Sequence, residues 1–159
     1  MTDLITSISV IIPVYNEERT ISSILEIIQG WGKATEIIVI NAGSTDRTLN
    51  ALKQFVPVIK LLSYKQNRGK GHALIRGIEK STGEYLLFVD GDLIGLTHQA
   101  LNLVVEPVIK GNCDMTVGVR MLPRYSKIDL FKTLGGERAL KKTDILPYLK
   151  KIKKSGYGV

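Results

Sequence analysis

The chain has 159 residues, 44% of them hydrophobic and 23% charged, and this balance indicates one globular domain with a sizeable core. It has no apolar run near the roughly 18–20 residues of a membrane-spanning helix, no basic secretory leader and one cysteine, Cys113, so we expect a cytoplasmic protein without intramolecular disulfides. The net charge of +7 is concentrated in residues 120–159, where 11 Lys and Arg stand against 3 Asp and Glu, and it favours an anionic partner such as a phosphate or an acidic membrane face.

Apolar, β-branched runs alternate with helical patterns over the first three quarters of the chain. The predicted strands are residues 8–14, 36–40, 58–62, 84–89 and 114–121. The predicted helices are one capped by Asn16 and ending near Gly30, one through residues 47–55, one over 69–80, and one capped by Thr97. Four strand–helix repeats of this length predict an α/β fold, a mostly parallel sheet flanked by helices.

After residue 121 the alternation ends. Residues 123–132 have a loop-like composition, Gly135 and Gly136 are expected to precede a short helix, and residues 142–154 predict a basic amphipathic helix. The chain closes on a glycine-rich stretch, residues 155–159, so we expect the natural domain to continue beyond it.

The segment Asp90-Gly91-Asp92 follows directly on an apolar strand. Two ionised carboxylates cannot lie unpaired inside a core, so the strand must emerge here, at its carboxyl end, where open α/β sheets bind ligands. Two carboxylates separated by a glycine offer the oxygen ligands that Mg²⁺ or Mn²⁺ takes together with substrate phosphates. The alternative is a solvated Asp-Gly-Asp turn.

Three further loops accompany the predicted strands: residues 15–17, 41–46 and 67–71. The first two lie at the same sheet edge as Asp90-Gly91-Asp92, and the helix amino termini that follow such loops suit phosphate groups. Residues 67–71 match neither a Walker A loop nor a dinucleotide fingerprint, yet Lys70 between two glycines can reach a phosphate. His72 and His98 are expected on helix surfaces, and no Cys/His cluster suggests zinc.

Four motifs in this order resemble family-2 glycosyltransferases of the GT-A fold, above all the polyprenyl-phosphate sugar transferases and relatives of glucosyl-3-phosphoglycerate synthase. They are Val-Ile-Ile-Pro-Val-Tyr-Asn-Glu (10–17), Gly-Ser-Thr-Asp-Arg-Thr (43–48), Asn-Arg-Gly-Lys-Gly (67–71) and Phe-Val-Asp-Gly-Asp-Leu (88–93). Residues 135–140, Gly-Gly-Glu-Arg-Ala-Leu, are similar to a later motif of such enzymes. The resemblance implies that residues 1–121 bind a nucleotide-sugar and that residues 122–159 begin the acceptor side of a single domain.

The resemblance also implies roles for individual residues. The nucleotide-sugar would be bound by Pro13, Tyr15, Glu17, Asn41, Gly43, Lys70, Asp90 and Gly91. Asp90 and Asp92 would hold Mg²⁺ or Mn²⁺, with Asp92 the stronger candidate for direct contact. Among the residues expected to act in catalysis, besides Asp92, Arg138 would reach a phosphate of donor or acceptor and Glu137 is the candidate general base. Asn41-Ala42 departs from the family, in which many members carry Asp-Asp, and asparagine can pair with a base edge but supplies no charge.

The implied activity is metal-dependent, inverting transfer of a sugar from a UDP- or GDP-sugar to a phosphate-bearing or hydroxyl acceptor. Arg138 and the basic residues favour a phosphorylated acceptor such as a polyprenyl phosphate, with peripheral contact at the anionic inner face of a membrane. A non-catalytic nucleotide-sugar-binding module and, with less support, a sugar-nucleotide pyrophosphorylase are the alternatives. No nucleic-acid partner is expected, because no aromatic side chains interleave with the lysines.

Overall fold

The computed structural model describes residues 6–119 and 134–154. A six-stranded sheet of order β3-β2-β1-β4-β6-β5 forms its centre. The strands are β1 (Ile8–Val14), β2 (Glu36–Asn41), β3 (Lys60–Ser63), β4 (Tyr85–Phe88), β5 (Met115–Val119) and β6 (Leu134–Lys141). The first four strands pair in parallel, whereas β6 runs antiparallel to both β4 and β5.

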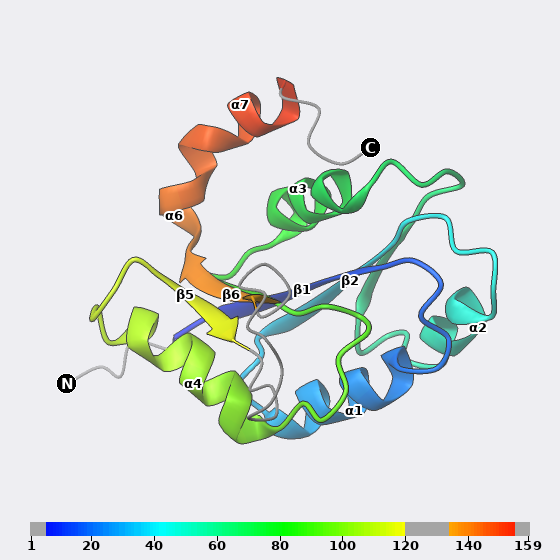
Figure 1. Cartoon of the computed structure of the whole chain (residues 1–159), viewed down its shortest axis with the longest axis horizontal. Helices are drawn as coiled ribbons and strands as arrows, with labels where there is room; N and C mark the ends of the chain where they lie inside the picture. The colour runs from blue at the N-terminus through cyan, green and yellow to red at the C-terminus, as the bar shows by residue number, and fades with distance from the viewer. Residues whose placement is uncertain (1–5, 120–133, 155–159) are drawn as a thin grey trace, which may run out of the picture.

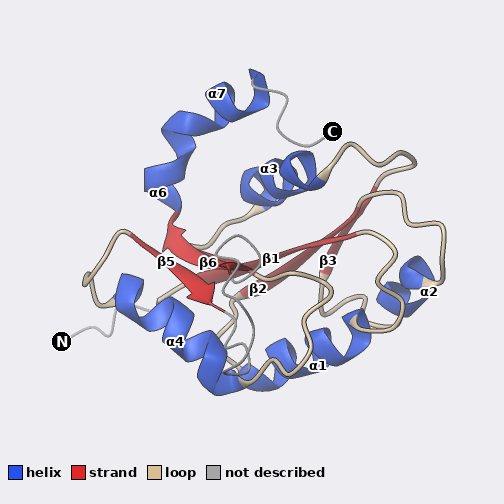
Figure 2. Cartoon of the chain, in the orientation of Figure 1, coloured by secondary structure: helices blue, strands red, loops and turns tan. Residues whose placement is uncertain are grey.

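Helices cover both faces of this sheet (Figures 1 and 2). One face carries α1 (Ile21–Trp31), α2 (Thr48–Lys53) and α4 (His98–Ile109), and the other carries α3 (Lys70–Lys80) and the chain of short helices α6 (Lys142–Ile145), η1 (Leu146–Tyr148) and α7 (Leu149–Lys154). The predicted α/β fold with a mostly parallel, helix-covered sheet is therefore confirmed.

Two apolar clusters hold the layers together, one on each face of the sheet. Val10 and Ile12 of β1 pack with α1 and α4, while Ile11 between them packs with α3, and all three are fully buried. Successive side chains of a strand point to opposite faces, so a strand covered on both sides is apolar at nearly every position. This explains the Ile-Ser-Val-Ile-Ile-Pro-Val run of β1, in which the buried Ser9 hydroxyl donates to Glu36.

The predicted N-cap of helix α1, Asn16, was wrong, whereas its predicted end near Gly30 is confirmed. Asn16 lies four residues before Thr20, which occupies the N-cap position, and it adopts a left-handed conformation with φ of 58°. The helix passes through Gly30 and ends at Trp31, because Gly32 supplies the left-handed residue, with φ of 69°, that terminates it. The Thr97 cap of α4 is confirmed, since its hydroxyl accepts a 3.1 Å hydrogen bond from the Ala100 amide.

The prediction of a short helix after Gly135 and Gly136 was also wrong. These residues belong to β6, which fills the place beside β4 with Leu87 opposite Ala139 and Phe88 opposite Arg138. Residues 142–154 do not form one continuous helix, because Pro147 lies in the 3₁₀ turn that separates α6 from α7. Residues 120–133 and 155–159, including the predicted loop over 123–132, lie outside the described residues. Within the described ranges, no helix has the length and apolar character needed to cross a bilayer.

Candidate active site

A cavity of about 310 Å³ opens at the carboxyl ends of β1, β2 and β4. The sheet order places β1 between β2 and β4, so their following loops meet at one crevice, as expected where strand order reverses in an open α/β sheet. Its lining residues are Pro13, Val14, Tyr15, Glu17, Ala42, Asn67, Gly69, Lys70, Ala73, Asp90, Gly91 and Asp92. Seven of the sequence-predicted site residues therefore line one cavity: Pro13, Tyr15, Glu17, Lys70, Asp90, Gly91 and Asp92.

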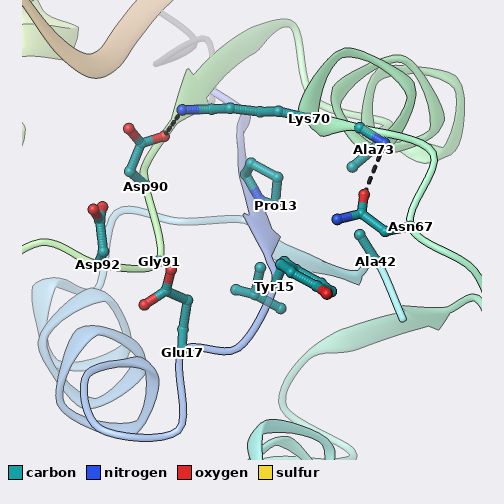
Figure 3. A pocket seen from close by; sticks show the side chains of 12 residues that line it. Pro13, Tyr15, Glu17, Ala42, Asn67, Lys70, Ala73, Asp90, Gly91 and Asp92 are labelled. Carbon is teal, nitrogen blue, oxygen red and sulfur yellow. Dashed lines mark hydrogen bonds and ion pairs between the residues drawn. The ribbon is translucent and has the colours of Figure 1, made fainter. Parts of the chain in front are cut away.

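The side chains divide this cavity into two ends (Figure 3). Glu17, Asp90 and Asp92 gather at one end, and Tyr15 lies with Ala42 at the other. Tyr15 is 43% exposed, so its ring is available to a planar group. An acidic end and an aromatic end in the same cavity suit a ligand with a cation-bridged anionic part and a flat ring.

Negative charge accumulates at the acidic end. Burial raises the pKa of Glu17, and the nearby charge of Asp92, then those of Asp46 and Asp90, raise it further, against one hydrogen bond from Thr20. Such mutual repulsion is relieved when a cation enters. Lys70 already supplies one positive charge, with its Nζ 2.6 Å from Asp90 Oδ1.

The donor set suits a metal only in part. Carboxylate oxygens are the ligands of Mg²⁺ and Mn²⁺, and Asp90 and Asp92 can present them from one turn. Within the described ranges, however, no group of three or more Asp, Glu, His or Cys side chains could enclose an ion. The protein residues therefore fit a metal whose remaining ligands come from substrate phosphates.

Hydrogen bonds between the loops after β1 and β2 fix this rim. Asn16 accepts from the Thr45 amide at 2.8 Å and donates its own amide to the Ser44 hydroxyl at 3.0 Å. The Glu17 amide donates to the Thr48 hydroxyl at 2.8 Å. Asn16 thus links two loops instead of capping a helix, and it helps to set the backbone at Glu17.

Two glycines allow the close packing at the acidic end. A Cβ at Gly91 would lie 2.8 Å from Val14 Cγ1, and a Cβ at Gly136 would lie 1.8 Å from Asp90 Oδ2. Strand β6 therefore passes directly against the Asp90 carboxylate, and no side chain can be accommodated at Gly136 without moving it.

Asn41 and Gly43, both predicted to contact the nucleotide, do not line the cavity. Asn41 is 1% exposed, donates through Nδ2 to the Ser63 hydroxyl at 3.0 Å and accepts through Oδ1 from the Ser44 amide at 3.1 Å. Gly43 has φ of 78° and lies against the backbone of Gln66 and Asn67. In this structure both residues shape the turn after β2, and their contacts with a nucleotide stay predictions.

Arg138 and Glu137 project from opposite faces of β6. Arg138 lines a second cavity, of about 450 Å³, together with Lys70, Asp90 and apolar residues of α3 and α7. Glu137 lines a third, of about 610 Å³, on the α4 side of the sheet. The structure thus brings Arg138 to Lys70 and Asp90 and keeps Glu137 apart from them.

Sequence reasoning assigned no role to Asn67, Ala42 or Ala73, which also line the first cavity. Asn67 belongs to the Asn-Arg-Gly-Lys-Gly motif, so its place beside Lys70 was a usable signal. The two alanines give no such signal in the sequence, because small apolar residues are also common in cores.

A mostly parallel sheet with this strand order and an acidic crevice at its carboxyl-terminal edge is typical of the GT-A class of nucleotide-diphosphate-sugar transferase folds. The chain belongs to glycosyl transferase family 2, whose profile matches residues 9–155. This confirms the resemblance found in the sequence.

Individual relatives support the same assignment. The chain is 32% identical over 140 residues to glucosyl-3-phosphoglycerate synthase of Mycolicibacterium smegmatis, covering 84% of this chain and 44% of that protein. It is 39% identical over 99 residues to dolichyl-phosphate beta-glucosyltransferase of Dictyostelium discoideum, covering 54% of this chain and 30% of that one. The chain thus spans less than half the length of these two relatives.

Solved structures agree with the fold. Glucosyl-3-phosphoglycerate synthase from Mycobacterium tuberculosis, in complex with Mn²⁺, UDP and glucosyl-3-phosphoglycerate, superposes with a TM-score of 0.72 at 25% identity. The match covers 87% of this chain and 57% of that chain. The same synthase has also been crystallised with Mg²⁺ and UDP.

Proposed function

We propose that this chain carries the donor site of a glycosyltransferase that moves a sugar from a UDP-sugar to a phosphate-bearing acceptor with the help of Mg²⁺ or Mn²⁺. The observation that carries the proposal is the acidic end of the first cavity, where Glu17, Asp90 and Asp92 meet beside Lys70. Its support from known proteins is family membership and the similarity to a synthase crystallised with UDP and either ion.

Asp90 and Asp92 would hold the metal, and the metal would supply Lewis-acid stabilisation of the departing diphosphate. Lys70, placed at the first turn of α3, would then exchange its contact with Asp90 for a phosphate oxygen. Tyr15 would flank the base at the opposite end of the cavity. The diphosphate would thus lie at the acidic end of the cavity and the base at the end with Tyr15, the two ends seen in Figure 3.

The bond between the anomeric carbon and the β-phosphate oxygen breaks, and the acceptor oxygen forms the new bond to that carbon. A phosphate acceptor is already anionic, so no general base has to remove a proton. Arg138 and Lys70 line the second cavity together, and its apolar walls from α3 and α7 would suit the chain of a lipid phosphate. This geometry supports a phosphorylated acceptor of the polyprenyl-phosphate kind.

We expect inversion, because the acceptor would attack from the face opposite the leaving diphosphate. Proton NMR of the product gives the anomeric coupling constant and so distinguishes inversion from retention. A retained configuration would contradict the proposed inversion, but it would not contradict the proposed donor site.

Asp92→Asn tests the donor site, with Asp114→Asn, an exposed residue away from the cavity, as the matched control. A thermal-shift series with UDP and GDP, with and without Mn²⁺, reads out binding through ligand-dependent stabilisation. We expect Mn²⁺-dependent stabilisation by UDP in the wild type and in Asp114→Asn, and its loss in Asp92→Asn. Equal stabilisation in all three proteins would overturn the metal assignment.

A nucleotide-sugar-binding module without turnover is the second candidate, because the features of the first cavity would also support binding alone. Release of UDP from UDP-glucose in the presence of a phosphorylated acceptor separates the two, because a binding module saturates without releasing product. The family assignment argues against the pyrophosphorylase alternative.

A further inference from the structure

The third cavity contains a buried carboxylate oxygen that has no hydrogen-bond partner among the described residues. Glu137 is 9% exposed, and its Oε1 is buried with no hydrogen-bond partner among the described residues. Burying an ionised carboxylate without compensation is strongly unfavourable, so a native protein keeps one only where something completes it. The carboxylate faces a cavity of about 610 Å³, a volume within the usual range of ligand sites.

Among the described residues of the cavity wall, none offers Glu137 a free side-chain donor. Its walls are aliphatic, formed by Leu87 and residues of the 93–96 loop and helix α4. Thr116 also lines it, but its hydroxyl donates to the Val104 carbonyl. Among the described lining residues there is no Lys, Arg or His.

The absence of a side chain at Gly118 leaves room for the same carboxylate. A Cβ at Gly118 of β5 would lie 2.9 Å from Glu137 Oε2, so any side chain there would push the carboxylate aside. A cavity with one charged acceptor and aliphatic walls suits a group with hydroxyl donors and C–H faces, which is the surface of a sugar ring.

Two chain segments connect this cavity with the donor site, although Glu137 itself projects from the other face of β6. Leu93 follows Asp92 directly, and Glu137 follows Gly136, whose backbone lies against Asp90. A ligand anchored by its diphosphate at Asp90 and Asp92 can therefore extend around this rim toward Glu137.

We infer that Glu137 and the aliphatic cavity beneath the 93–96 loop form a carbohydrate-recognition site, in which the carboxylate accepts hydrogen bonds from hydroxyl groups of the donor sugar or of a hydroxylated acceptor. This inference rests on the proposed donor function and assigns Glu137 to substrate specificity, a different role from the general base expected from the sequence. Hydrogen bonds to a charged group discriminate strongly against ligands without the hydroxyl.

The test compares wild type, Glu137→Gln and Glu137→Leu, with Glu26→Gln on the exposed face of α1 as control. Calorimetry with Mn²⁺ present measures UDP and UDP-glucose binding, and then 3-phosphoglycerate binding to the UDP complex. If the donor sugar lies here, UDP-glucose binds roughly 10- to 100-fold more weakly to both Glu137 variants while UDP is unaffected. If the hydroxyls belong to the acceptor, only 3-phosphoglycerate binding falls by that factor.

Melting of the ligand-free proteins adds an independent readout. Both Glu137 variants should melt higher than wild type by roughly 2–4 °C, because each removes a buried carboxylate whose Oε1 has no hydrogen-bond partner among the described residues. Lower melting in both, or unchanged binding in both ligand arms, would overturn the inference. Failure of wild type to bind UDP would instead remove the proposed function on which it rests.

Discussion

At the scale of single residues, Asp90 is the most constrained side chain of the site. Lys70 contacts one carboxylate oxygen at 2.6 Å, and the other lies where a Cβ at Gly136 would have to be. The ligand-free protein thus carries an internal cation at the position where a metal is proposed. A metal bound at Asp90 would therefore require Lys70 to move.

Lys70→Met should move two affinities in opposite directions. Without the ammonium, Mn²⁺ no longer competes with an internal cation, so Mn²⁺ alone should bind several-fold more tightly, while UDP with Mn²⁺ should bind about 10-fold more weakly because a charged phosphate contact is lost. Electron paramagnetic resonance of free Mn²⁺ and calorimetry of UDP give the two constants. Lys80→Met, on the exposed end of α3, is the control, and parallel losses in both constants would contradict the exchange of partners.

Gly136→Ala should disable the donor site through sterics alone. The added methyl would lie 1.8 Å from Asp90 Oδ2, so the carboxylate or β6 must shift. We expect Mn²⁺-dependent UDP affinity to fall at least about 10-fold, since metal geometry tolerates little displacement. Gly30→Ala, whose Cβ would make only ordinary contacts with His98, is the control and should stabilise helix α1 by about 0.5–1 kcal/mol. Normal UDP affinity in Gly136→Ala would show that the described packing is wrong.

That Asp90, Asp92 and Lys70 line one cavity could be predicted from the sequence, because each lies in a motif with a chemical reason for its residue types. The placement of Glu137 and Arg138 in different cavities could not be predicted. Their separation onto opposite faces depends on residues 134–141 being a strand, and alternation across a strand cannot be inferred once a helix is expected.

At the scale of elements, β6 shows why long-range pairing is hard to predict. Gly135 and Gly136 give the segment little strand propensity of its own. Its strand conformation is imposed by neighbours distant in sequence, with Leu86 opposite Leu140 on β4 and Thr116 opposite Ala139 on β5. By contrast, β1, β2 and β4 were predictable, because strands buried on both faces are apolar throughout.

The Glu36 carboxylate connects neighbouring strands at the edge of the sheet where the parallel strands begin. Glu36 of β2 accepts hydrogen bonds from the Ser9 hydroxyl of β1 and the Thr82 amide before β4, each at 2.5 Å, and pairs with Lys60 of β3. Burial alone would raise the pKa of Glu36, but the contacts from Lys60, Ser9 and Thr82 outweigh it and lower the pKa from 4.5 to about 2.

This depressed pKa makes stability depend on pH. The stabilisation is fully present above the ordinary pKa of 4.5 and is lost as pH falls toward 2. The contribution of Glu36 to the free energy of unfolding, measured with urea, should therefore be about 2 kcal/mol smaller at pH 3 than at pH 6. Glu36→Gln should be less stable than wild type at pH 6, and its unfolding free energy should fall less between pH 6 and pH 3. UDP binding should be unchanged, because Glu36 lies at the opposite edge of the sheet from the donor site. Equal pH dependence in Glu36→Gln, wild type and the Glu26→Gln control would contradict the prediction.

At the scale of the whole molecule, the two edges of the sheet have different tasks. Contacts such as those of Glu36 connect strands at the amino-terminal edge, whereas the acidic side chains of the first cavity lie at the carboxyl-terminal edge. The charge is divided as well, because residues 1–119 carry 11 Lys and Arg against 12 Asp and Glu, so the basic excess belongs to the final quarter of the chain.

The last described helices combine this charge with exposed apolar groups. Lys150 and Lys151 of α7 are exposed, and Leu146 and Tyr148 in the preceding turn are 44% and 59% exposed. Lysines beside exposed aromatic and aliphatic side chains are typical of segments that lie at an anionic lipid surface. The same helices border the cavity that Lys70 and Arg138 share, where a lipid phosphate acceptor is proposed.

We therefore predict binding to vesicles that contain phosphatidylserine and little binding to pure phosphatidylcholine, measured by co-sedimentation at 50 and 300 mM salt. Replacing Lys150 and Lys151 by Gln should weaken the anionic-vesicle partition about 30-fold, since each lysine contributes roughly 1 kcal/mol at such a surface, and added salt should weaken the wild-type interaction. Replacing the exposed Lys53 and Lys65 by Gln removes the same charge elsewhere. If both double variants lose equal affinity, net charge alone attracts the protein, and α7 has no specific place at the membrane.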